Sequence, residues 1–232
     1  MGERTFDDFD EFATGYRELH TQNIKLSGAD SFYFAEHKIL LLKNTEKNDG
    51  ARMLDIGCGD GATELFVHQN FPSWFVEGID ISSESIIQAN KRNLINSQFS
   101  LYNGMQIPFE TNSFDIVFMA AVLHHIEHTL HPVILKEIYR VLKPGGRLYV
   151  FEHNPINPVT RYLVNTCVFD KDAQLLSFWY TDRILKTASF KSLRKKFILF
   201  FPRKGLLSRL VKIEKFLGWF PLGAQYYFRC VK

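Results

Sequence analysis

The chain has 232 residues, of which 46% are hydrophobic and 23% are charged, which is the composition of a folded globular protein and excludes a disordered or fibrous one. This length predicts one compact domain with a decorated terminus. The net charge is only +3, but residues 191–232 carry 11 Lys and Arg against one acidic residue, so the rest of the chain is net acidic.

The sequence shows no sign of a membrane span or a signal peptide. Its longest apolar runs, at residues 116–123 and 197–201, are far shorter than the ~20 residues that a membrane-spanning helix needs. The acidic first thirteen residues differ from the positive start of a signal peptide. Three cysteines, Cys58, Cys167 and Cys230, are odd in number and far apart, which indicates reduced thiols. We therefore expect a cytoplasmic protein.

Strand and helix signals alternate along the chain after a helical prelude. Residues 1–50 are predicted as a helical N-terminal cap, and residues 51–232 as the main domain, with an irregular insert at about 153–180. Within it we expect strands at 52–56, 74–79, 99–102, 114–121, 147–151, 196–201 and 226–231, and helices at 62–70, 82–94, 132–142 and 182–190. This alternation predicts a doubly wound α/β sheet.

A glycine-rich loop, Asp55-Ile56-Gly57-Cys58-Gly59-Asp60-Gly61, follows the first predicted strand. Glycines there let the backbone approach a ligand closely, and the helix N-terminus behind them favours a negative group. The loop also fits a dinucleotide fingerprint, with Asp80 at the end of the second strand as a ribose ligand, so an NAD(P)-dependent oxidoreductase is one alternative. Asp55 and the lack of residues for a further substrate domain argue against it.

Over about residues 51–152 the sequence resembles the class I S-adenosylmethionine (SAM) dependent methyltransferases, in particular the small-molecule group with a type 11-like methyltransferase domain. The resemblance rests on six blocks in order, Leu54-Asp55-Ile56-Gly57-Cys58-Gly59-Asp60-Gly61, Gly78-Ile79-Asp80, Ile107-Pro108-Phe109, Phe114-Asp115-Ile116-Val117, Leu123-His124-His125 and Val141-Leu142-Lys143-Pro144-Gly145-Gly146. It implies a Rossmann-like sheet of seven mostly parallel strands, with helices on both faces, the last strand antiparallel, and SAM as the cofactor.

The same resemblance implies roles for individual residues. Asp55 and Gly57 would border the methionine part of SAM, Asp80 would bind the ribose hydroxyls, and Tyr16 would contact SAM from an N-terminal lid. Asn103 stands where family members often have an Asp that touches the adenine amino group. The predicted cofactor site as a whole is Tyr16, Asp55, Gly57, Cys58, Gly59, Asp80, Ile81, Asn103, Gly104, Met105 and Ala120.

A general base is predicted at the end of the fourth strand. In similar O-methyltransferases the first His of a Leu-His-His turn acts as base, oriented by an acid at the end of strand five, which implies His124 and Glu152 here. His153 is the reserve candidate. The alternative is that this His pair only caps the next helix and that proximity alone drives the reaction. We expect no metal site, because His131 precedes a proline and no fourth ligand is evident near it.

The acceptor is predicted as a small or glycan-like molecule methylated on a hydroxyl oxygen, with an acceptor pocket walled by the 153–180 insert. Alternatives are a lipid, membrane-associated or nucleic-acid acceptor, and a non-catalytic SAM-binding protein. In residues 200–219 apolar side chains alternate with basic ones at helical spacing. We predict a helix that covers the last strands, with an interfacial helix at a membrane, or at another anionic partner, as the alternative. The sequence predicts no oligomeric state.

Overall fold

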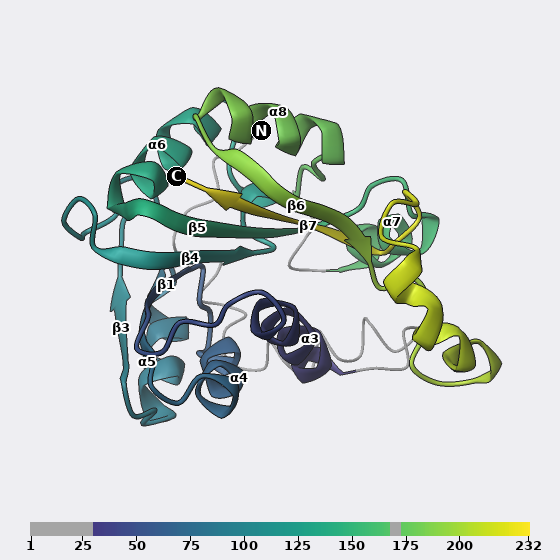
Figure 1. Cartoon of the computed structure of the whole chain (residues 1–232), viewed down its shortest axis with the longest axis horizontal. Helices are drawn as coiled ribbons and strands as arrows, with labels where there is room; N and C mark the ends of the chain where they lie inside the picture. Colours follow the sequence, from purple (N-terminus) through teal and green to yellow (C-terminus); the bar gives the residue numbers. More distant parts are fainter. Residues whose placement is uncertain (1–29, 168–172) are drawn as a thin grey trace.

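The computed structural model describes residues 30–167 and 173–232. At its centre lies one sheet of seven strands in the order β3-β2-β1-β4-β5-β7-β6 (Figure 1). The strands are β1 Arg52–Ile56, β2 Phe75–Asp80, β3 Ser97–Leu101, β4 Phe114–Ala120, β5 Leu142–His153, β6 Lys191–Ile198 and β7 Gln225–Val231. β1 to β5 pair in parallel, and β7 is antiparallel to both of its neighbours, β5 and β6. This confirms the predicted sheet and its antiparallel last strand.

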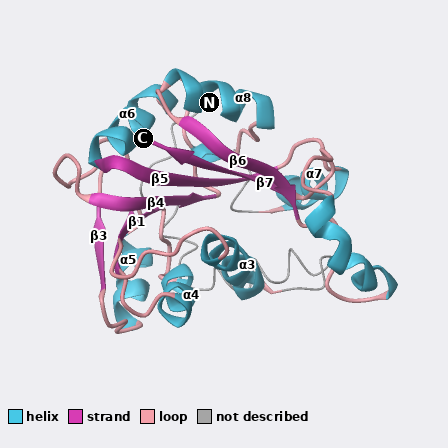
Figure 2. Cartoon of the chain, in the orientation of Figure 1, coloured by secondary structure: helices cyan, strands magenta, loops and turns pink. Residues whose placement is uncertain are grey.

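Helices cover both faces of the sheet (Figure 2). α6 (His131–Val141) and α8 (Phe178–Thr187) lie on one face, and α3 (Ser31–Lys43), α4 (Ala62–Asn70) and α5 (Ser83–Lys91) lie on the other. Several helices begin where a polar side chain caps them, as Ser82 does by accepting a hydrogen bond from the amide of Ser85. Asp30, Asn157 and Ser177 cap α3, α7 (Pro158–Thr166) and α8 in the same way.

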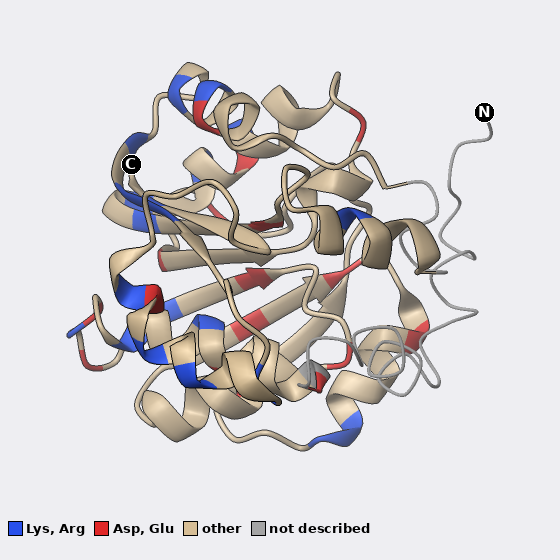
Figure 3. Cartoon of the chain, turned by 90° about the vertical axis from the view of Figure 1, so that its right-hand side faces the viewer, with Lys and Arg blue, Asp and Glu red and all other residues tan. Residues whose placement is uncertain are grey.

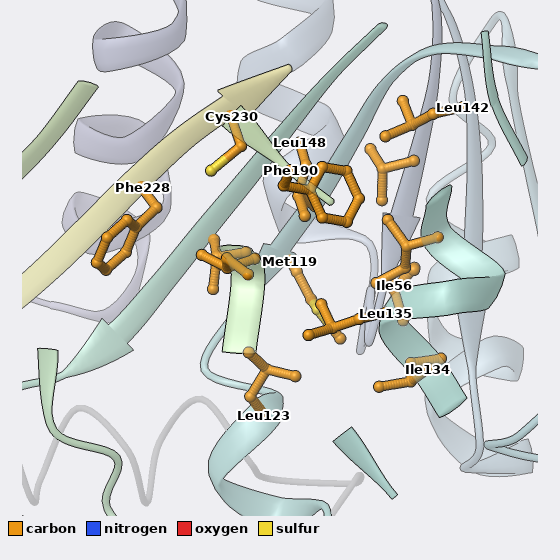
Figure 4. Close-up of a cluster of buried hydrophobic side chains, with 14 of the residues drawn as sticks. Ile56, Met119, Leu123, Ile134, Leu135, Leu142, Leu148, Phe190, Phe228 and Cys230 are labelled. Atoms are coloured by element: carbon orange, nitrogen blue, oxygen red, sulfur yellow. The ribbon is translucent and has the colours of Figure 1, made fainter. Parts of the chain in front are cut away.

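Two hydrophobic cores lie against the two faces, and β4 contributes to both. Val117 and Met119 point into the core beneath α6 (Figure 4), whereas Ile116 and Phe118 point into the core beneath α3 and α4. Side chains alternate between the faces of a strand, so a central strand covered on both sides is apolar throughout. The uninterrupted apolar run that we noted in the sequence is therefore explained by the central position of β4.

Several of the predicted boundaries are wrong. β5 begins at Leu142 instead of 147, because Leu142 already pairs with Phe114 before the next four residues bulge out of the ladder. α8 and β6 each begin several residues earlier than predicted. The insert also contains a helix, α7, although we expected irregular structure there. Its start, Asn157 followed by Pro158, is a helix-capping pair that we interpreted as a loop signal.

The segment between β6 and β7 forms a 3₁₀ helix, η3 (Leu206–Phe216), none of whose residues is buried. The yellow-green coil at the right of Figure 1 extends away from the sheet. Our prediction of a helix that covers the last strands is therefore wrong. Within the described residues, no helix is both long and apolar enough to cross a membrane.

Candidate functional site

The candidate site lies where the parallel strands β2, β1, β4 and β5 end. These four strands are neighbours in the sheet, and ligands of open α/β sheets bind beyond the carboxyl ends of such strands. β1 leads into the glycine loop, residues 57–61, and β2 ends at Asp80. β4 leads into the short 3₁₀ helix η2 (Leu123–His125), and β5 ends at His153. The topology therefore brings the predicted site residues together at one edge.

The glycine loop is held against the end of β2 by backbone hydrogen bonds. Gly57, Gly59 and Gly61 have φ angles of 74°, 54° and 75°, in the left-handed region that favours glycine. The amide of Gly57 donates to the carbonyl of Ile79 at 2.8 Å, and the amide of Gly59 donates to Oδ2 of Asp80 at 2.8 Å. The loop conformation that the sequence pattern predicts is thus fixed by β2 as well as by its own glycines.

Close packing surrounds the loop on both sides. A Cβ at Gly57 would lie 2.5 Å from Cγ2 of Val122, so the segment after β4 packs directly on the loop. A Cβ at Gly78 would lie 2.9 Å from Sγ of Cys58, whose side chain is buried. Burial raises the pKa of the Cys58 thiol well above its usual value. Cys58 therefore fills space in protonated form.

Two further predicted segments meet beside the loop. Oδ1 of Asp80 accepts a hydrogen bond from the amide of Ser82 at 2.9 Å, which ties β2 to the start of α5. Oδ1 of Asn103 accepts from the amides of Met105 and Gln106 at 3.0 and 2.9 Å. The carboxamide of Asn103 thus holds a backbone turn, and its adenine contact stays a prediction.

Ile81 and Gly104 lie against each other, since a Cβ at Gly104 would be 3.4 Å from Cγ2 of Ile81. Ala120 ends β4, and the next residue, Ala121, has a left-handed φ of 59° while its amide donates to the carbonyl of Phe151. These predicted residues therefore belong to the same edge. Tyr16 lies outside the described residues.

A buried pair of carboxyl groups lies next to the loop. Asp55 is 2% exposed and Glu64, in the first turn of α4, is 0% exposed. Burial and the neighbouring Glu64 raise the pKa of Asp55 well above its usual value, and burial raises the pKa of Glu64 to about 7. Neither side-chain oxygen of Glu64 meets the geometry of a hydrogen bond with any of the described residues. Both carboxyl groups therefore keep their protons to a higher pH than usual, and Lys38 and Arg92 are the cations that oppose this shift.

Glu64 was missed in the sequence analysis. An acid in the first turn of a helix usually faces solvent and interacts favourably with the helix dipole, so Glu64 looks like an ordinary surface residue in the sequence. The available signal was its spacing of three from Gly61 and Val67, since residues three apart on a helix share a face. Gly61 and Val67 both face the interior, and Glu64 lies between them.

His124 and Glu152 form a buried dyad. Nδ1 of His124 lies 2.6 Å from Oε2 of Glu152, and both side chains are 1% exposed. Oε1 of Glu152 accepts from the amides of Val122 and Leu123 at 3.2 and 2.8 Å. A carboxylate beside Nδ1 favours the imidazole tautomer that is protonated on Nδ1, so that Nε2 carries the lone pair. The ring of His153 is 5.3 Å from that of His124, so the structure brings the three predicted catalytic residues together.

His131 supports the turn that carries the dyad. Its Nε2 donates to the carbonyl of Leu123 at 3.0 Å, and its Nδ1 lies 2.9 Å from the hydroxyl of Tyr180. Burial lowers the pKa of His131, which keeps the ring neutral for both contacts. His128 stacks on Tyr180. In residues 30–167 and 173–232, no three His, Cys, Asp or Glu side chains gather in a way that could hold a metal ion.

Comparison with known proteins finds relatives among the methyltransferases. Residues 54–150 match the model of a family described as a methyltransferase domain. A demethylmenaquinone methyltransferase from Symbiobacterium thermophilum is 36% identical over 126 residues, which are 51% of this chain and 48% of that protein. A sterol 24-C-methyltransferase from Schizosaccharomyces pombe is 31% identical over 171 residues, 64% of this chain and 43% of that protein. The chain thus spans about half the length of the curated relatives it matches.

Solved structures show the same fold at low sequence identity. A SAM-dependent methyltransferase from Thermotoga maritima superposes with a TM-score of 0.70 at 20% identity, covering 98% of this chain and 100% of that one. A phosphoethanolamine N-methyltransferase from Haemonchus contortus, solved with SAM, gives a TM-score of 0.66 at 21% identity and covers 97% of this chain and 60% of that one.

Proposed function

We propose that the chain is a class I SAM-dependent methyltransferase, as the match of residues 54–150 to a methyltransferase domain supports, and that it transfers a methyl group to the hydroxyl oxygen of a small-molecule acceptor. The observation that carries the proposal is the buried dyad of His124 and Glu152 beside the glycine loop. The family match sets aside the nicotinamide-dependent alternative considered from the sequence.

The residues around the loop fit SAM. The positive φ angles of Gly57, Gly59 and Gly61 shape a loop without side chains at these positions, whose backbone a ligand can approach closely. The amino acid part of SAM carries an ammonium group, and a cation bound beside Asp55 and Glu64 would favour the ionised form of these two buried carboxyl groups. We assign the ammonium group to this pair, and the ribose hydroxyls to Asp80.

The chain's own contribution to the chemistry is to hold the acceptor and to take up one proton. Bound SAM supplies a methyl group on a sulfonium, which is an electrophile that needs no further activation. Nε2 of His124 accepts the proton of the acceptor hydroxyl, and the resulting oxyanion is the nucleophile. Glu152 keeps the ring oriented and stabilises the imidazolium that forms.

The acceptor chamber is assigned to the segment after β5. Asn154 is fully buried there, and its Nδ2 donates to the carbonyls of Pro221 and Gly223 at 3.0 and 2.8 Å, so its amide holds the wall together. Two of the relatives carry names that refer to demethylmenaquinone and a sterol, both small organic acceptors. These names support a small-molecule acceptor. The choice of oxygen rests on the dyad alone.

The test is methyl transfer from SAM to a panel that holds a phenol, an aliphatic alcohol, a sugar and a primary amine, followed by mass spectrometry. We expect a hydroxyl compound to gain one methyl group. His124→Ala should then lower turnover by roughly 10²–10⁴-fold, the usual contribution of a general base, while the SAM dissociation constant stays within about twofold.

His128→Ala is the matched control, because His128 is exposed and lies on the loop after η2. We expect its turnover to equal that of the wild type. Full turnover by His124→Ala would mean that proximity alone drives the reaction. Methylation of the amine, with the hydroxyl compounds untouched, would contradict the proposed acceptor.

A further inference from the structure

The side chains of η3 fall into three rows. In a 3₁₀ helix, residues three apart eclipse each other. One row is apolar, the next begins with Leu206 and is otherwise cationic, and the third faces the body of the protein. The rows are Leu207, Leu210, Ile213 and Phe216; Leu206, Arg209, Lys212 and Lys215; and Ser208, Val211, Glu214 and Leu217. All residues of the first two rows are exposed, and all residues of the third are half-buried.

The third row anchors η3. The Glu214 carboxylate accepts hydrogen bonds from the amides of Phe200 and Phe201, both at 2.9 Å. The carbonyl of Gly218 accepts from the amide of Phe197 in β6 at 2.9 Å. These contacts fix η3 to the body of the protein and leave its other two rows exposed.

The outer surface of η3 carries cations and no acid. Glu214 is the only acidic residue in 191–232, and its carboxylate is turned inward to the backbone amides. Arg209, Lys212 and Lys215 are all exposed. Figure 3 looks onto the right-hand end of Figure 1, where η3 lies, and shows Lys and Arg gathered there.

The apolar surface is larger than η3 alone. Leu206 is 77% exposed, Phe216 68% and Trp219 76%, and Leu207, Leu210, Ile213, Phe220 and Leu222 are also exposed. We call these eight residues, with the cationic row, the η3 surface. Exposed apolar side chains in such number mark an interaction site instead of an ordinary solvated face.

The η3 surface is joined to the acceptor wall. Nδ2 of Asn157, at the start of α7, donates to the carbonyl of Leu222 at 2.7 Å. On α7 and just before it, Ile156, Val159 and Tyr162 are exposed as well. Asn154, two residues after Glu152, hydrogen-bonds to the same loop. The apolar surface thus continues from η3 to the segment that follows the dyad.

We propose that the η3 surface docks on an anionic phospholipid bilayer, with the apolar row and Trp219 inserted among the acyl chains and the cationic row against the headgroups. A row of Leu, Ile and Phe beside a row of Lys and Arg is the composition of interfacial helices. Nucleic acid would engage the cations but leave the aliphatic row in water. A second copy of the chain would bring the cationic rows into repulsion.

Docking in this way turns the acceptor wall toward the bilayer. The acceptor would then be an amphiphile that enters from the membrane. This last step rests on the proposed function, whereas docking itself does not.

The test is co-sedimentation of the full chain with vesicles, without SAM or acceptor. One set of vesicles is pure phosphatidylcholine, and the other contains phosphatidylglycerol as well. We expect binding to the anionic vesicles that weakens in 0.5 M NaCl, since the headgroup attraction is screened. Lys212→Gln should weaken binding about fivefold, the equivalent of ~1 kcal/mol for one charge near the surface. Leu207→Ser combined with Phe216→Ser should weaken it at least about tenfold.

The matched controls lie at the far edge of the sheet, near β3. Ile95 is 83% exposed and Lys91 is exposed on α5, so Ile95→Ser and Lys91→Gln remove the same kinds of group elsewhere. We expect both controls to bind vesicles like the wild type. All substituted residues are exposed, so the variants keep the fold, which circular dichroism verifies.

The proposal is overturned if the wild-type chain stays in the supernatant with both kinds of vesicle, or if the controls lose as much binding as the η3 variants. It is also overturned if sedimentation velocity shows a dimer that Leu207→Ser with Phe216→Ser dissociates. Binding of a labelled oligonucleotide without vesicle binding would assign the surface to nucleic acid. None of these outcomes depends on methyl transfer, so failure of docking and failure of the proposed function remain distinguishable.

Discussion

Glu46 and Glu64 are both buried, yet their surroundings differ completely. Oε2 of Glu46 accepts from Nη2 of Arg147 at 2.6 Å, and Oε1 accepts from the hydroxyl of Tyr149 at 2.6 Å and from Nη2 of Arg229 at 3.0 Å. Glu64 has no arginine or lysine at hydrogen-bond distance among the described residues, and its carboxyl neighbour is another acid, Asp55.

This difference separates two uses of a buried charge. A carboxylate whose lone pairs are all satisfied links segments of the fold, as Glu46 links the end of α3 to β5 and β7. An unsatisfied buried carboxyl group destabilises the fold, so its presence beside a glycine loop points to a cationic ligand. The comparison therefore assigns Glu46 to structure and Glu64 to cofactor binding, and each assignment has a test.

Glu46→Ala should give the largest effect, a loss of roughly 3–5 kcal/mol in the free energy of unfolding, because two arginines and the buried Tyr149 hydroxyl lose their common partner. Urea denaturation measures it. The SAM dissociation constant of the folded fraction should stay within about twofold. A loss below about 1 kcal/mol would show that Glu46 does not hold the segments together.

The second-largest expected effect is the pH dependence of the free energy of unfolding that Glu64 causes. Burial raises the pKa of Glu64 to about 7 in the fold, against about 4.3 in an unfolded chain, so the folded protein binds more protons between these values. The free energy of unfolding should therefore fall by about 3 kcal/mol more in the wild type than in Glu64→Gln as pH rises from about 4.5 to 7. Urea denaturation at several pH values measures it.

Burial also raises the pKa of Asp55, which keeps a slope of the same sign in Glu64→Gln, so the difference in slope between wild type and variant is the quantity to compare. Burial lowers the pKa of His37 to about 4, which gives a slope of the opposite sign. Lys38 on α3 and Asp60, Asp80 and Arg92 around the loop also face the two carboxyl groups. If the free energy of unfolding changed with pH equally in wild type and variant, the pKa of Glu64 would not be raised by burial.

The fold and much of the site could be predicted because short local patterns determine them. The apolar run of β4 required a central strand, and the glycines at 57, 59 and 61 required the left-handed turns that the structure shows. The family blocks placed His124 and Glu152 at the ends of neighbouring strands, and their hydrogen bond follows from strand pairing.

The rest depended on packing that a sequence does not display. Glu64 looks like an ordinary helix-start acid, and only the arrangement of α4 against the sheet buries it. The residues of η3 were interpreted with the 3.6-residue period of an α-helix, which places the half-buried Val211 on the same face as the exposed Leu207 and Leu210. With the three-residue period of a 3₁₀ helix they separate into distinct rows, and the apolar row faces outward.

The smallest expected effect concerns SAM binding by Glu64→Gln. At pH 8 the Glu64 carboxyl is ionised, because its pKa is about 7, and it attracts the ammonium group that we assign to the pair. The amide variant keeps the shape but not the charge, so SAM should bind about tenfold more weakly, in line with one charged hydrogen bond. At pH 6 the wild-type carboxyl is largely protonated, and the difference should shrink to about twofold. Calorimetric titration measures both values, with the exposed Glu36→Gln as a control that changes the same charge on α3. Equal affinities at pH 8 would move the ammonium group away from Glu64 and leave its burial without a ligand to explain it.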